Sequence, residues 1–68
     1  MKIKPDKHEA YYNKACAYAL QENISLTIEN LKQAINLDSQ SLEDAKTDTD
    51  FDKIRHTLSF QKLISEKH

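Results

Sequence analysis

Alternating carboxylates occur at DTDFD, Asp48 to Asp52, and this is the spacing in the chain most suggestive of metal chemistry. Carboxylates at every second position can converge on a hard cation such as calcium. A calcium loop with this opening also needs Gly at its sixth position and a bidentate Glu at its twelfth, where this sequence has Lys53 and Ser59. The mismatch favours helix capping by Asp48, and we expect no bound metal or other cofactor.

The single cysteine, Cys16, could act as a nucleophile only beside a base that lowers its pKa. On a helix its same-face neighbours are Tyr12 and Ala19, and tyrosine is a poor base at neutral pH. We therefore expect Cys16 to pack as a small apolar residue.

No other catalytic arrangement stands out in the sequence. The three histidines, His8, His56 and His68, are scattered singly, without the spacing of a metal site, and are expected at the surface. The chain contains no glycine, so no glycine-rich phosphate loop is possible. The chain is predicted not to be an enzyme.

Composition limits the function further. With 68 residues, 31% charged and 38% hydrophobic, the chain is at most one soluble domain with a small core. Its net charge of −1 argues against nucleic acid as a main partner. Apolar runs are too short for a membrane span or a signal segment, so a cytoplasmic protein without membrane contact is expected.

The stretch that would hold Cys16 predicts a helix over residues 8–21, with Glu9 in its first turn. Large and small side chains alternate on two adjoining faces of this helix: Tyr11, Ala15 and Tyr18 on one, and Tyr12, Ala15, Cys16 and Ala19 on the other. Such a surface suits close packing against another helix.

A second helix is predicted over residues 24–37, because Ile24, Ile28, Leu31 and Ile35 recur at steps of four, three and four. Asn23 is placed to cap it. The short link at 21–23 makes the two helices antiparallel, and Ala15 and Ala34 would let their backbones approach closely.

Residues 39–68 are more polar and are predicted to form short helices that cover this pair. A third helix should begin near Ser39 to Ser41. Asp48 and Thr57 are predicted caps for two later helical segments. The expected buried residues are Leu42, Ala45, Phe51, Ile54, Phe60, Leu63 and Ile64, and the expected solvated ones are Lys53, Arg55, Lys62, Glu66 and Lys67.

Residues 3–9 align weakly with residues 37–43, an offset of 34 residues. Together with the helix patterns, the chain resembles a tetratricopeptide repeat over residues 8–41. The family's aromatic, small and aromatic positions of the first helix match Tyr11, Ala15 and Tyr18. Its second helix has a small residue, a large apolar residue, Ala and then an acidic residue, and these match Thr27, Leu31, Ala34 and Asp38. The sequence departs from the pattern at Lys14, where Leu is usual, at Glu22, where the turn has Gly, and at Ser39, where Pro is usual.

The resemblance implies an all-α fold: residues 1–7 as the tail of a preceding repeat, 8–38 as an antiparallel helix hairpin and 39–68 as C-terminal capping helices. The phrase IKPD suggests that Met1 is an artificial start and that the chain ends a longer bacterial-type array; a natural single-repeat protein is the alternative. On either interpretation an apolar face needs a neighbour, so self-association or a loose N-terminal end is expected.

Members of the family bind peptides or helices in a groove lined by their first helices. The matching positions here are Glu9, Tyr12, Asn13, Cys16 and Ala19. Asn13 stands where members that bind a C-terminal carboxylate often have Asn, but the basic residues they also need are missing. The resemblance therefore predicts a protein-interaction scaffold. The alternative is a structural cap or self-dimerising module, in which Tyr12, Cys16 and Ala19 only pack on a neighbour.

Overall fold

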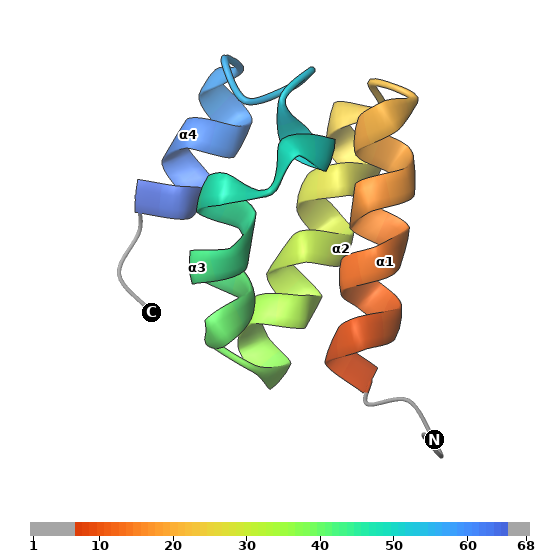
Figure 1. The fold of residues 1–68 in the computed structure, drawn as a ribbon, viewed down its shortest axis with the longest axis vertical. Helices are drawn as coiled ribbons and strands as arrows, with labels where there is room; N and C mark the ends of the chain where they lie inside the picture. Colours follow the sequence, from red (N-terminus) through yellow and green to blue (C-terminus); the bar gives the residue numbers. More distant parts are fainter. Residues whose placement is uncertain (1–6, 66–68) are drawn as a thin grey trace.

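The computed structural model describes residues 7–65, and every regular element in that range is helical (Figure 1). In chain order the elements are α1 (Lys7–Leu20), α2 (Ile24–Leu37), α3 (Gln40–Thr47), the 3-10 helix η1 (Thr49–Phe51) and α4 (Leu58–Ser65). The prediction of an all-α fold is confirmed. None of the helices described is long and apolar enough to cross a membrane. The tail was predicted over residues 1–7, but Lys7 belongs to α1. Residues 1–6, and Glu66, Lys67 and His68, lie outside the described residues.

The first two helices lie side by side and run in opposite directions (Figure 1). The bounds of α2 match the predicted ones, whereas α1 begins and ends one residue earlier than expected. Asn23 caps α2 as predicted, because its side-chain oxygen accepts a 3.3 Å hydrogen bond from the amide of Leu26. Ala15, Ala19 and Ala34 are fully buried, which removes side-chain bulk between the two helices.

The turn between α1 and α2 contains the one described residue other than glycine with positive φ, Glu22 at 62°. A residue with a Cβ is disfavoured in this left-handed conformation, which is why such turns usually contain glycine. The amides of Glu22 and Asn23 bond the carbonyls of Ala19 and Tyr18, and this closes the end of α1. Glu22, which stands where the family pattern has glycine, therefore keeps the turn but adopts a strained conformation.

The elements after α2 form the other half of the core. Five of the apolar side chains predicted to be buried there are at most 2% exposed: Ala45, Phe51, Ile54, Phe60 and Leu63. The rings of Phe51 and Phe60 are in contact, with centroids 5.4 Å apart. Ile64 and Leu42 are half-buried at the edge of the same cluster. The C-terminal residues thus bury their apolar side chains together with those of α1 and α2.

The predicted caps in this half are both present. Asp48 accepts a 2.9 Å hydrogen bond from the amide of Asp50 at the start of η1, and Thr57 accepts one of 3.3 Å from the amide of Phe60 in α4. The start of α3 at Gln40 lies within the predicted range of Ser39 to Ser41, and the side chain of Asp38 accepts a 3.0 Å hydrogen bond from the amide of Gln40.

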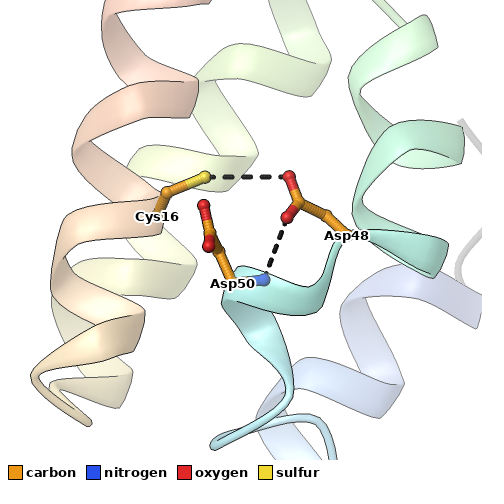
Figure 2. A group of neighbouring side chains, drawn as sticks. All are labelled: Cys16, Asp48 and Asp50. Atoms are coloured by element: carbon orange, nitrogen blue, oxygen red, sulfur yellow. Dashed lines mark hydrogen bonds between the residues drawn. The ribbon is translucent and has the colours of Figure 1, made fainter.

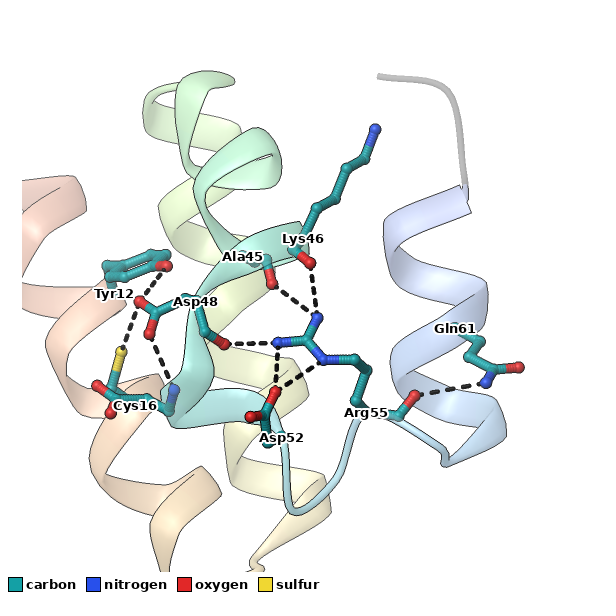
Figure 3. A network of polar contacts seen from close by, with 9 residues as sticks. Tyr12, Cys16, Ala45, Lys46, Asp48, Asp52, Arg55 and Gln61 are labelled. Carbon is teal, nitrogen blue, oxygen red and sulfur yellow. Dashed lines mark hydrogen bonds and ion pairs between the residues drawn. The ribbon is translucent and has the colours of Figure 1, made fainter.

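The prediction that the Arg55 side chain is solvated is wrong. Its guanidinium donates to the carbonyl oxygens of Ala45, Lys46 and Asp48, at the C-terminal end of α3 (Figure 3). The last carbonyls of a helix have no intrahelical donor, and a planar cation with several N–H groups can satisfy more than one of them. Arg55 thereby joins the segment after η1 to α3.

His8 also differs from the surface residue that was expected. Its side chain is half-buried, and its Nε2 lies 3.4 Å from Oδ2 of Asp38. The contact joins the first turn of α1 to the residue that follows α2. This proximity depends on the antiparallel course of the two helices, which brings the start of one to the end of the other.

Candidate functional site

A groove between α1 and α3 is the most plausible site in the described part of the chain. It encloses a pocket of about 420 Å³ lined by His8, Glu9, Tyr12, Asn13, Ser41 and Asp44. Its lining comes from α1 and α3, which both run upward from the lower end of the molecule in Figure 1. Three of the five residues that the resemblance singled out, Glu9, Tyr12 and Asn13, line this pocket.

Sequence reasoning missed the residues of α3 that complete the groove, Ser41 and Asp44. Ser41 is only 2% exposed, whereas Asp44 is an exposed side chain on the rim. No local pattern could find these two residues, because their place in the lining depends on how α3 is positioned relative to α1.

Tyr12 is fixed in the groove by contacts within the chain. Its hydroxyl donates a 2.8 Å hydrogen bond to Oδ2 of Asp48, and its ring meets that of Phe51 edge to face at 5.7 Å between centroids. Burial, followed by the hydrogen bond to Asp48, raises the pKa of the Tyr12 hydroxyl. The side chain is therefore a neutral, immobilised part of the groove wall.

Cys16 lies one turn further along α1, and its surroundings differ from the sequence expectation. Its thiol points toward the carboxylates of Asp48 and Asp50, and its Sγ lies 4.0 Å from Oδ2 of Asp48 (Figure 2). One ligand atom from each of the three side chains falls within 4.8 Å of the others. The sequence analysis placed only Tyr12 and Ala19 beside Cys16, because Asp48 and Asp50 are distant along the chain.

These carboxylates do not activate the thiol. Burial, reinforced by the negative charges of Asp48 and Asp50, raises the pKa of Cys16 to about 12. A thiol that stays protonated at neutral pH is a poor nucleophile. Asp48 also uses both oxygens internally, one for the amide of Asp50 and one for the hydroxyl of Tyr12. The geometry favours a structural role for Cys16, Asp48 and Asp50.

Ala19, the last of the predicted partner contacts, is fully buried. Its side chain belongs to the core cluster and has no surface for a partner. Tyr12 and Cys16 are partly buried against the same cluster. Tyr12 and Cys16 contact this chain's own C-terminal half, at Asp48 and, for Tyr12, Phe51. Glu9 and Asn13 are the predicted contacts that remain exposed.

A smaller pocket, of about 240 Å³, lies between α2 and α4 and was not anticipated. Its lining combines the apolar side chains of Ile28 and Leu63 with Ser59 and two exposed lysines, Lys32 and Lys62. The two pockets therefore have opposite charge.

Searches with protein-family models, against curated proteins and against solved structures found no match for the chain. The groove combines a hollow, an anchored aromatic ring, exposed hydrogen-bonding groups and two carboxylates. These features suit recognition of another molecule.

Proposed function

We propose that the chain is a protein-interaction module that binds an extended peptide or a helix of a partner protein in the groove between α1 and α3. The proposal includes a tetratricopeptide-like hairpin of α1 and α2, closed by the later helices as a C-terminal cap. The observation that carries it is the pocket of about 420 Å³, whose lining includes Glu9, Tyr12 and Asn13. These are positions that the family resemblance assigned to partner contact.

Binding would occur without a chemical step. Tyr12 is held in one orientation by Asp48 and Phe51, so little conformational freedom remains to be lost when a partner contacts it. The exposed amide of Asn13 can both donate and accept hydrogen bonds, as the backbone of an extended peptide requires. Affinity would come from shape and polar contacts along two helices.

The test uses two matched substitutions of exposed helical asparagines. Asn13→Arg places a large side chain in the groove, and Asn36→Arg makes the same change on α2, outside the pocket lining. The wild-type protein and both variants are immobilised, and the proteins they capture from a cell lysate are identified. We expect specific partners to be lost with Asn13→Arg and retained with Asn36→Arg. Equal capture by the two variants would exclude the groove as the binding site.

A second candidate function is self-association as a dimerising or capping module. Tyr11 and Tyr18 share one face of α1, two turns apart, and both are half-buried without joining the core cluster of the described residues. An aromatic face of this kind is suited to packing on a second copy. Sedimentation velocity over a range of concentrations tests it: a dimer that Tyr18→Lys weakens supports this function, and a concentration-independent monomer contradicts it.

A further inference from the structure

The groove between α1 and α3 carries negative charge on both walls. Glu9 on α1 and Asp44 on α3 line the pocket, and both side chains are exposed. Neither takes part in an ion pair within residues 7–65. Asp44 accepts a long hydrogen bond, 3.4 Å, from the uncharged amide of Gln40. The two carboxylates are therefore available to a ligand.

His8 is the lining residue that could oppose this charge. Its Nε2 lies 3.4 Å from Oδ2 of Asp38, so a proton on the imidazole is matched by that carboxylate. A further carboxylate, that of Asp48, lies behind the hydroxyl of Tyr12 at the groove wall. An anionic ligand would be repelled from this surface, and a cationic one would be attracted.

Building on the proposed function, we infer that the occupant of the groove is a cationic segment, an extended stretch of a partner chain that inserts a Lys or Arg side chain between Glu9 and Asp44. The pocket, at about 420 Å³, has room for a long side chain and lies in the range typical of small-ligand sites. The ring of Tyr12 adds attraction for a cation through its π face. Asn13 bonds the backbone of the segment.

The charge of the whole molecule does not explain this selectivity. The net charge is −1, and the pocket between α2 and α4 carries Lys32 and Lys62 in place of acidic residues. Glu9 and Asp44 thus distinguish the pocket between α1 and α3 from the pocket between α2 and α4. Net charge alone would not direct a cationic peptide to this groove. Selective binding there requires direct contact with Glu9 and Asp44.

The experiment compares three fluorescently labelled peptides of equal length: alternating Lys and Ala, alternating Gln and Ala, and alternating Glu and Ala. Fluorescence anisotropy measures their binding to the wild type, to Glu9→Gln/Asp44→Asn in the groove, and to Glu29→Gln/Glu43→Gln. The last variant removes two exposed carboxylates outside the pocket lining, so both variants change the net charge equally. Circular dichroism checks that all three proteins are folded.

We expect the Lys peptide to bind the wild type more tightly than the other two peptides. The groove variant should weaken its binding about tenfold, the control variant should leave it nearly unchanged, and added salt should reduce it. An equal loss in both variants would overturn the inference, because the effect would then be one of overall charge. A groove variant that disrupts a dimer while the Lys peptide fails to bind would also overturn it, because the occupant would be a second copy.

The proposed function fails in a different way. If the Gln peptide binds as tightly as the Lys peptide, and Asn13→Arg abolishes both, the groove is a peptide site without selection for cations, and only the inference is lost. If Asn13→Arg affects no peptide and no captured partner, the groove is not a binding site, and the proposed function is lost with the inference.

Discussion

The hydroxyl of Tyr12 on α1 donates a 2.8 Å hydrogen bond to the carboxylate of Asp48, 36 residues further along the chain. The other oxygen of Asp48 caps η1 through the amide of Asp50, and the backbone carbonyl of Asp48 accepts from Arg55 (Figure 3). One residue thus ties α1, η1 and the following turn together. Because one side chain of the groove wall depends on this residue, the groove and the docking of the C-terminal half are coupled.

Tyr12→Phe should destabilise the protein by about 1–2 kcal/mol, because it removes the hydrogen bond to Asp48 and retains the ring contact with Phe51. Urea unfolding followed by circular dichroism measures the free energy of unfolding. Tyr11→Phe, at a half-buried position on another face of α1, is the control and should cost less than about 0.5 kcal/mol. Equal losses would mean that the Tyr12–Asp48 bond adds nothing.

Stability should fall as the pH rises through the alkaline range. The folded-state pKa values of Cys16 and Tyr12 both lie above their ordinary values, so the folded protein retains protons that the unfolded chain releases. The stability from Cys16 is complete below its ordinary pKa of 9.0 and is lost between there and about pH 12. Urea midpoints across this range measure the loss, and Cys16→Ala should flatten its first part. A rise in stability with pH would contradict both shifts.

The thiol of Cys16 should also react slowly at neutral pH, since its pKa of about 12 leaves almost no thiolate. Iodoacetamide labelling followed by mass spectrometry measures the rate in the folded protein and in urea. We expect Asp48→Asn, which removes one of the neighbouring negative charges, to speed labelling in the folded state. Folded-state labelling as fast as that in urea would show that the thiol is not shielded.

Glu22→Gly should stabilise the protein by about 0.5–1 kcal/mol, because φ at this position is 62° and glycine adopts that conformation without strain. The substitution also removes a 4.0 Å contact between exposed side chains of Glu22 and Lys53, which contributes little. The matched control is Gln21→Gly, at a neighbouring position without positive φ, which should destabilise. Thermal unfolding of the two variants should therefore shift in opposite directions.

Arg55→Lys should destabilise the protein by about 1–2 kcal/mol although it keeps the charge. A lysine ammonium cannot reach the carbonyls of Ala45, Lys46 and Asp48 with the geometry of a guanidinium. Hydrogen exchange should show faster opening of α3 in particular. Lys53→Gln, at an exposed position nearby, is the control, and a similar change there would mean that Arg55 does not cap α3.

Leu31→Ala should cost about 2–5 kcal/mol, the usual range for truncating a fully buried leucine. In a chain of 68 residues this is a large part of the total stability, so the helical signal should be mostly lost at room temperature. Leu58, which is 72% exposed, provides the matched control, because Leu58→Ala should leave the urea midpoint nearly unchanged.

The sequence by itself determined the helices and their caps. The apolar spacing of Ile24, Ile28, Leu31 and Ile35 predicted α2 with its observed bounds, and the caps at Asn23, Asp48 and Thr57 followed from residue type and position. These signals are readable because a helix and its cap involve hydrogen bonds between residues only a few positions apart.

Only the tertiary structure decided which of these helices share a surface. In the folded chain Asp48 lies beside Tyr12 and Cys16. Arg55 binds the end of α3 instead of lying in solvent, and Asp44 of α3 lines the same pocket as residues of α1. Each of these relationships joins residues on different elements. Their distances are fixed by how the helices stack around the buried phenylalanines, and that stacking depends on side-chain volume in three dimensions and leaves no periodic trace along the chain.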